Sequence, residues 1–237
     1  MLVGVGKQMA VTITWTGHST FLVDTGAGVL LVDPFLDECP TSSIQASDVH
    51  CDAILITHGH FDHFVDAIPL VRASGAKFVG SYELVEYVET QGVTDVHPLH
   101  IGGGWDFPFG RAKMVTAVHG GRVYGEGAEA YTTNPGGFVF DLGQGKRVYH
   151  AGDTGLTLDM KLLRDKVDIA LLPIGDNFTM GLEDAVTAVE FIRPSIVIPF
   201  HYKTWPYIEQ DPEIFKAMVG DRATVEILEP GKGSFDF

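Results

Sequence analysis

The chain is poor in cysteine, with only Cys39 and Cys51 among its 237 residues. A disulfide framework needs a larger and regularly spaced set of cysteines, and a cysteine-based zinc site needs closely spaced pairs. The spacing here fits neither class, and we interpret both residues as unpaired, buried thiols. Any metal site in this chain is therefore expected to use nitrogen and oxygen ligands.

Positive charge is also scarce, because 16 lysines and arginines stand against 31 aspartates and glutamates, which gives a formal net charge of −15. A surface of this charge repels phosphate backbones and anionic lipids. The sequence contains no run of lysine or arginine that would form a local basic patch. We therefore expect a small-molecule substrate and no nucleic-acid or membrane partner, while a homo-oligomer stays compatible with the sequence.

Long apolar runs are missing as well. Residues 1–10 contain one lysine and no long apolar core, so we expect neither a signal peptide nor an anchor there. No other stretch has the length that a transmembrane helix needs. These absences favour a cytoplasmic protein. Because the first strand pattern opens at Met9, residues 1–8 are predicted to be a disordered extension and residues 9–237 a single domain.

Strand-like runs and helix patterns alternate along the chain. Three short apolar runs at 11–15, 19–24 and 28–34 predict an antiparallel start, and the apolar run 52–57 predicts a strand covered on both faces. Further strands are predicted at 77–80, 111–118, 136–142, 146–152, 167–174, 195–200 and 224–230. Helices are predicted at about 64–74, 81–92, 156–165, 181–194 and 212–219, with a loop at 100–110. Two facing sheets with helices outside would cover these strands, so the predicted fold is an α/β four-layer αββα sandwich.

The segment THGHFDH follows the apolar run 52–57 and carries four candidate metal ligands, His58, His60, Asp62 and His63. Imidazole nitrogens and carboxylates are suitable ligands for zinc, manganese and iron. An irregular loop at a strand end can turn alternate residues toward one centre. The segment therefore predicts a metal site.

Three further candidate ligands, His119, Asp153 and His201, each follow a predicted strand. Taken singly each is a weak signal, but together they complete two metal sites. Two cations a few ångströms apart lower the pKa of a shared water toward neutrality and present it to an electrophilic carbon or phosphorus. Hydrolysis is therefore the expected chemistry.

With these residues in place, the sequence resembles the metallo-β-lactamase superfamily of αββα hydrolases, whose signature is HxHxDH followed by a histidine, an aspartate and a last histidine. The resemblance extends to the segments WTGHSTFLV, LLVDPFLD, YHAGDT, LPIGDNFTMGLEDAV and IPFHYKT. These segments are similar to a branch of metal-dependent hydrolases that is itself similar to the bacterial L-ascorbate-6-phosphate lactonases. A small polar ester, lactone or phosphodiester is the implied substrate.

The resemblance also implies a ligand set. It implies one metal held by three histidines, His58, His60 and His119. It implies a second metal held by Asp62, His63 and His201, with Asp153 bridging, so Asp62 and Asp153 are implied catalytic residues. Ligation by nitrogen and oxygen alone suits two divalent ions, with Zn²⁺ as first choice and Mn²⁺ as second.

Other functional classes share parts of this pattern. Sulfur dioxygenases keep HxHxDH but use a single iron, so a mononuclear iron oxidoreductase stays open. A tRNA-processing nuclease is close in fold, although the acidic chain lacks the basic surface that would hold its substrate. A metal-loaded protein without activity is disfavoured because the full ligand set is present.

Two residues near the motif have competing interpretations. Asp33 in LLVDPF fits a turn or cap, but the resemblance implies that it braces the metal loop. His18 in TGHST fits a structural histidine, but the resemblance implies a place in the pocket, where it would polarise substrate or move a proton. We adopt the functional interpretation for both.

Four residues are weaker candidates for substrate contact. Asn177 and Thr179 lie between a predicted strand and a predicted helix, where they would also serve as caps. Tyr202 and Lys203 directly follow the candidate ligand His201, and Lys203 is one of few cations near the predicted site. The resemblance implies that these segments border the substrate pocket.

Overall fold

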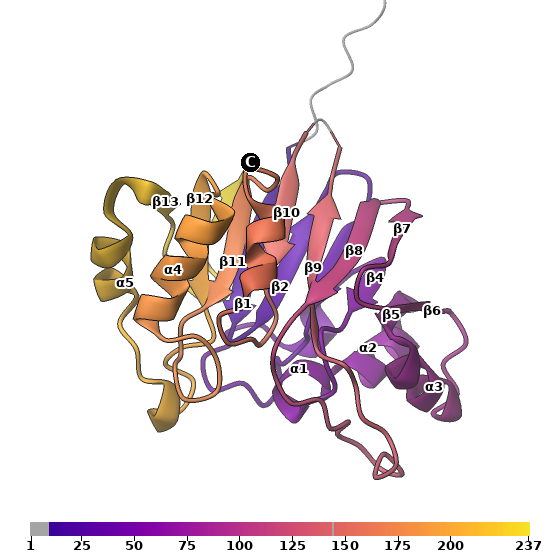
Figure 1. The fold of residues 1–237 in the computed structure, drawn as a ribbon. Helices are drawn as coiled ribbons and strands as arrows, with labels where there is room; N and C mark the ends of the chain where they lie inside the picture. Colours follow the sequence, from indigo (N-terminus) through magenta and orange to yellow (C-terminus); the bar gives the residue numbers. More distant parts are fainter. Residues whose placement is uncertain (1–9, 144) are drawn as a thin grey trace, which may run out of the picture.

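The computed structural model describes residues 10–143 and 145–237, so the predicted extension at residues 1–8 lies outside the described residues. Two seven-stranded sheets pack face to face, and helices lie on the outer side of each sheet (Figure 1). The predicted αββα layering is confirmed.

The first sheet has the strand order β14-β1-β2-β3-β4-β5-β6. Its strands are β1 (Thr12–Gly17), β2 (Thr20–Asp24), β3 (Val29–Val32), β4 (Ala53–Leu55), β5 (Lys77–Ser81), β6 (Val96–Leu99) and β14 (Ser234–Asp236). The strands from β14 to β3 pair antiparallel, and those from β3 to β6 pair parallel. The predicted antiparallel start is confirmed.

The second sheet has the strand order β13-β12-β11-β10-β9-β8-β7. Its strands are β7 (Gly104–Phe107), β8 (Gly110–Thr116), β9 (Gly136–Asp141), β10 (Arg147–His150), β11 (Ile169–Pro173), β12 (Ile196–Phe200) and β13 (Thr224–Val225). The strands from β7 to β10 pair antiparallel and those from β10 to β13 pair parallel. Each sheet thus has the same series of pairings, three antiparallel followed by three parallel.

Helices complete the outer layers. The first sheet carries α2 (Ala67–Ser74) and α3 (Tyr82–Thr90), and the second carries α4 (Leu182–Ile192) and α5 (Pro212–Val219). Alternation along β9 shows how the strands divide their side chains, because Phe138 and Phe140 are buried in the core between the sheets while Val139 and Asp141 are only partly buried. A smaller core fills the space between the first sheet and its helices.

Several boundaries differ from the sequence prediction. The predicted helix 64–74 is divided into α1 (Phe61–Phe64) and α2, and the predicted helix 156–165 is the 3₁₀ helix η2 (Leu158–Leu163). The loop predicted at 100–110 contains β7, and the strand predicted at 224–230 is reduced to β13. β6 and β14 were not predicted, because short, partly exposed edge strands lack a buried apolar run. The other 3₁₀ helices are η1 (Ala46–Asp48), η3 (Pro206–Ile208) and η4 (Gly220–Arg222).

The ends of several central strands meet at one edge of the sandwich, where α1 lies (Figure 1). β3 leads to Asp33, β4 leads to the THGHFDH segment, and β10 leads to Asp153. In α/β proteins, ligands bind beyond the carboxyl ends of parallel strands, because loops from neighbouring strands converge there. The C-terminus of the chain lies at the opposite edge.

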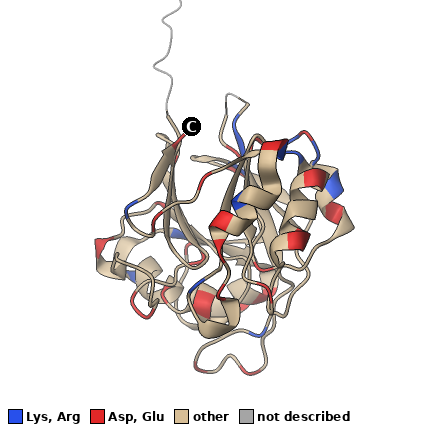
Figure 2. Cartoon of the chain, turned by 90° about the vertical axis from the view of Figure 1, so that its left-hand side faces the viewer, with Lys and Arg blue, Asp and Glu red and all other residues tan. Residues whose placement is uncertain are grey.

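The surface is acidic and carries no long basic tract. In Figure 2, acidic residues are distributed over helices and loops, with basic residues interspersed between them. Among the described residues, every helix is too short or too polar to cross a membrane.

Candidate metal centre

The THGHFDH segment leaves β4 and turns directly into α1. His58 is fully buried, and His60 is the extended residue that precedes the first turn of α1. That turn carries Asp62 and His63, so one short helix directs two adjacent side chains toward the same centre. The position between His58 and His60 requires glycine, because a Cβ atom on residue 59 would lie only 2.8 Å from the Cα atom of Val123.

One group of nitrogens comes from three histidines, His58, His60 and His119. Nδ1 of His60 lies 3.0 Å from Nε2 of His58 and 3.2 Å from Nε2 of His119. A tetrahedral zinc ion with Zn–N bonds of 2.0–2.1 Å separates its ligand nitrogens by about 3.3 Å. Burial lowers the pKa of all three histidines, which leaves them neutral with lone pairs available to a cation.

A second group of ligand atoms comes from His18, Asp62, His63 and His201, whose donor atoms lie within 4.8 Å of one another. Oδ2 of Asp62 lies 3.7 Å from Nε2 of His63 and 3.9 Å from Nε2 of His201. These distances are too long for hydrogen bonds, and they leave space between the groups. The second group adjoins the first through the contact of His58 with His63, whose ring centroids are 4.1 Å apart.

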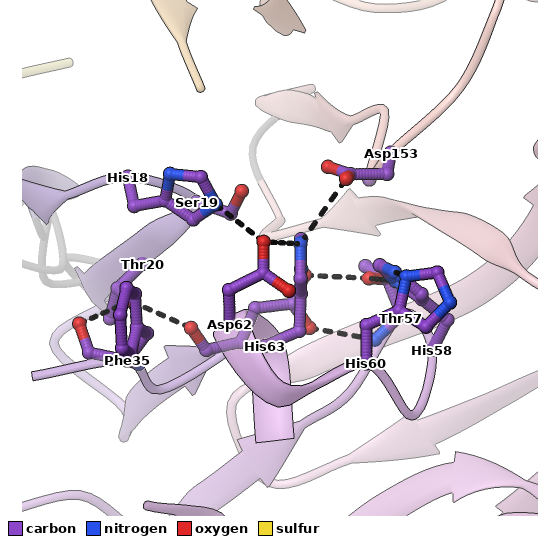
Figure 3. Close-up of polar contacts among 12 residues, drawn as sticks. His18, Ser19, Thr20, Phe35, Thr57, His58, His60, Asp62, His63 and Asp153 are labelled. Carbon is purple, nitrogen blue, oxygen red and sulfur yellow. Dashed lines mark hydrogen bonds and ion pairs between the residues drawn. The ribbon is translucent and has the colours of Figure 1, made fainter. Parts of the chain in front are cut away.

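Asp153 lies between the two groups. Its Oδ2 atom is 3.0 Å from Nε2 of His201, 3.3 Å from Nε2 of His63 and 3.6 Å from Nε2 of His119. Figure 3 shows the contact with His63 and the neighbouring Asp62. The carboxylate of Asp153 therefore contacts histidines of both groups.

Carboxylates dominate the charge at this centre. Burial lowers the pKa of His63, but the neighbouring carboxylates of Asp153, Asp62 and Asp33 outweigh it and raise this pKa well above its ordinary value. Burial raises the pKa of Asp153, but His201 and His63 outweigh it and hold this pKa well below its ordinary value. The centre thus favours positive charge, which a divalent cation would supply.

Two buried polar atoms at the centre lack hydrogen-bond partners in the part of the chain that the structure describes. Nε2 of His63 and Oδ1 of Asp153 have no hydrogen-bond partner among the described residues. A buried polar atom without a partner is costly, and native proteins rarely keep one. Metal ligation would satisfy both atoms, so the residues present fit a metal.

Asp33 connects the metal-binding loop to the first sheet. Its Oδ1 accepts a hydrogen bond from the backbone N–H of Thr57 at 2.7 Å. Its Oδ2 accepts from the Thr57 hydroxyl at 2.6 Å and contacts Nδ1 of His63 at 2.8 Å. A histidine that donates Nδ1–H to a carboxylate presents the lone pair of Nε2 to the centre. These contacts match the predicted bracing role, and Thr57 is a member of the loop that sequence reasoning missed.

His18 is placed differently from its prediction. The side chain is fully buried, with Nε2 2.9 Å from Oδ2 of Asp62 and Nδ1 2.8 Å from the Thr204 hydroxyl. Burial, with a contribution from His201, lowers the pKa of His18 to about 4. Both ring nitrogens therefore contact protein groups, and Figure 3 shows the contact of His18 with Asp62. His18 is not among the residues that line the cavity. The sequence could not reveal this, because the partner Thr204 lies 186 residues away.

Three residues of the centre have a strained backbone. His18, Asp33 and His201 have φ angles of 48°, 48° and 56°, in the left-handed region that non-glycine residues seldom adopt. Such strain persists only where surrounding contacts enforce it, and it clusters at functional sites. The backbone geometry thus supports a functional centre here.

The four weaker candidates lie away from the cavity wall. Tyr202 is buried against Trp15, with ring centroids 5.3 Å apart, and burial raises the pKa of its hydroxyl. Asn177 and Lys203 are exposed, and Thr179 is partly buried. The cavity wall is instead formed by the neighbours of these residues in the same two segments.

A cavity of about 390 Å³ opens beside the candidate metal ligands. It is lined by five candidate ligands, His60, Asp62, His119, Asp153 and His201, and by four aromatic residues, Phe61, Phe178, Trp205 and Tyr207. Its volume falls in the range of small-molecule sites. Sequence reasoning missed the aromatic residues, although Phe178 and Trp205 lie within four positions of predicted site residues.

Comparison with known proteins agrees with this geometry. The family model of the beta-lactamase superfamily domain matches residues 19–202. The chain is 45% identical over 225 residues to a UPF0173 metal-dependent hydrolase of Staphylococcus carnosus, with 93% of this chain and 97% of the relative covered. It is 46% identical over 223 residues to one of Shouchella clausii, with 92% and 97% covered.

The chain is also similar to a solved structure over nearly its whole length. Igni18, a metallo hydrolase from the hyperthermophilic archaeon Ignicoccus hospitalis, superposes with a TM-score of 0.85 at 34% identity, and the match covers 96% of this chain and 98% of that chain. The chain therefore belongs to the metallo-β-lactamase superfamily and, within it, to the UPF0173 family of metal-dependent hydrolases.

Proposed function

We propose that this hydrolase is binuclear. One cation would be held by His58, His60 and His119. The other would be held by Asp62, His63 and His201, and Asp153 would be shared. The observation that carries the proposal is the position of the Asp153 carboxylate, within 3.0–3.6 Å of histidine nitrogens from both groups. A single-iron oxygenase is the alternative, and the number of bound metal ions distinguishes it from the binuclear hydrolase.

The donor set favours Zn²⁺ first and Mn²⁺ second, because neutral imidazoles and carboxylates suit both ions. Two such cations would supply Lewis acidity and a hydrolytic nucleophile at neutral pH. The chain's own contribution is orientation: Asp33 directs His63, and His18 directs Asp62. Asp62 and Asp153 contribute the negative charge that holds the cations.

The proposed substrate is a small ester, lactone or phosphodiester. This class follows from the chemistry of a two-metal centre, which presents a nucleophile to an electrophilic carbon or phosphorus. A small molecule fits the cavity of about 390 Å³, and the acidic chain disfavours a nucleic-acid substrate. We further propose that residues 9–237 act as one domain, because the sequence shows no linker. We also propose a cytoplasmic location.

The first prediction concerns Asp153. Asp153→Asn keeps the side-chain volume but removes the charge that both groups share. We expect bound metal to fall from two equivalents to one or fewer and hydrolysis of a generic ester to fall by at least about a hundredfold. Elemental analysis of protein purified without chelators, together with kcat on the same preparation, measures both effects.

Asp221→Asn is the matched control, because Asp221 is exposed on η4 and belongs neither to the two groups of candidate ligands nor to the cavity lining. It should keep two metals and full activity. Two equivalents of metal and normal activity in Asp153→Asn would refute the shared carboxylate.

The second prediction concerns Asp33. Asp33→Asn keeps the shape but weakens the hydrogen bonds to Thr57 and His63, so metal affinity should fall by roughly 10–100-fold. Titration of the metal-free protein with zinc against a competing chelator measures the change. An unchanged affinity would mean that Asp33 serves only the turn after β3.

The third prediction separates a positioning role of His18 from a structural one. His18→Ala should lower kcat by roughly 10–100-fold, whereas His18→Gln, whose amide can still donate to Asp62, should recover part of that loss. Metal content is measured on the same samples. Equal losses in both variants, matched by equal losses of folded protein, would assign His18 a purely structural role.

A further inference from the structure

Five aromatic side chains surround the mouth of the metal centre. We call them the aromatic collar: Phe61, Tyr124, Phe178, Trp205 and Tyr207. Four of them line the cavity of about 390 Å³ above the ligands, and Phe61 and Tyr124 also line an adjoining hollow. They come from α1 and from the loops after β8, β11 and β12, so the collar forms only in the folded protein.

The collar contains two pairs of packed rings. Phe61 packs edge-on against Tyr124, with ring centroids 4.9 Å apart, and Phe178 packs edge-on against Tyr207 at 6.4 Å. Trp205 is held by Phe35 at 6.0 Å and by His18 at 4.7 Å. Trp205 is thereby fixed next to the residue that contacts Asp62. The collar therefore adjoins the centre directly.

Three rings of the collar are exposed to solvent, which is typical of a ligand-binding surface. Tyr124 and Phe178 are 50% exposed and Tyr207 is 75% exposed, whereas the ligands Asp153 and His201 beneath them are almost fully buried. Exposed aromatic groups gathered around a concave site mark a binding surface, because a ligand that covers them removes apolar area from water. An aromatic ring in the ligand would add edge or face contacts with the collar.

Charge around the cavity argues against an anionic substituent. Among the described residues that line the cavity of about 390 Å³, none is lysine or arginine. The adjoining hollow contains Arg122, but Glu126 and Glu129 outnumber it. A phosphate or sulfate group held in this adjoining hollow would meet more negative than positive charge from the side chains.

We propose that the substrate carries an uncharged aryl or similarly flat apolar group beside the bond that is cleaved, and that the aromatic collar binds this group. This inference rests on the proposed hydrolysis at the metal centre and names its substrate class. It excludes phosphorylated lactones from that class. The metals act on the ester or lactone bond, and the collar selects what is attached to it.

The test uses three hydroxamates that share a metal-binding group and differ in their tails. Acetohydroxamate has a methyl tail, phenylacetohydroxamate a neutral ring, and phosphonoacetohydroxamate an anion. Dissociation constants are measured by calorimetry on the metal-loaded protein. We expect the phenyl compound to bind at least about tenfold tighter than the methyl compound, because burial of a ring in the collar adds to the metal contact.

Variants of exposed collar residues show where the preference arises. Phe178→Ala and Tyr207→Ala should each reduce the phenyl preference several-fold while the affinity for acetohydroxamate and the metal content stay unchanged. Leu162→Ala is the matched control, because Leu162 is 68% exposed on η2, outside the metal centre and the collar. It should keep the full preference.

Other results would overturn the inference. Equal affinity for the methyl and phenyl compounds would reject the collar while leaving the metal centre intact. Tighter binding of the phosphono compound would assign an anionic substrate. Binding of none of the three to metal-loaded protein would also reject it. If the protein holds no metal, the proposed function fails, and saturation-transfer NMR with benzyl alcohol on wild type and Phe178→Ala then decides whether the collar binds rings.

Discussion

Three carboxylates, those of Asp33, Asp62 and Asp153, lie close together at one edge of the sandwich, and the arrangement of this edge depends on how their charge is balanced. Asp33 and Asp153 are almost fully buried. Buried charge is tolerated only with hydrogen bonds, opposite charge or a metal. Asp33 has hydrogen bonds from Thr57 and contacts His63, whereas Asp153 keeps an oxygen without a partner among the described residues. A bound cation would satisfy that oxygen and balance the buried charge.

This constraint accounts for local features that have no other function in the fold. The left-handed backbone at His18, Asp33 and His201 turns the chain sharply after β1, β3 and β12, so that the side chains converge. The two sheets supply rigid strands behind each of these turns. A loop-based site on such a scaffold keeps its geometry while the outer loops, which carry the aromatic collar, can differ between relatives.

The fold was largely predictable because its central strands are continuous apolar runs. The runs that became β4, β11 and β12 are buried on both faces, and that burial is visible in the sequence as unbroken apolar residues. The edge strands β6 and β14 were missed because their exposure leaves no such pattern. The 3₁₀ helix η2 was taken for an α-helix because the two share similar apolar spacing over a few residues.

Within the site, the convergence of the HxHxDH residues was predictable from their spacing, whereas contacts between distant segments were not. His18 meets Thr204 and Asp62 only through tertiary structure, and its neighbours in sequence carry no sign of this. Tyr202 was expected at the pocket, but the chain turns after β12 and directs Tyr202 into the core and Trp205 to the cavity. Adjacent positions in an irregular loop can point in opposite directions, and no periodicity reports which one faces the ligand.

The central claim is that Asp153 joins two cations in one centre. Crystals of the zinc-loaded protein, measured at the zinc absorption edge, test this most directly. A binuclear centre predicts two anomalous peaks about 3.5–4 Å apart, with Asp153 between them. One peak should lie beside His58, His60 and His119, and the other beside Asp62, His63 and His201. A single peak at full occupancy, with the second group of residues hydrogen-bonded among themselves, would contradict it.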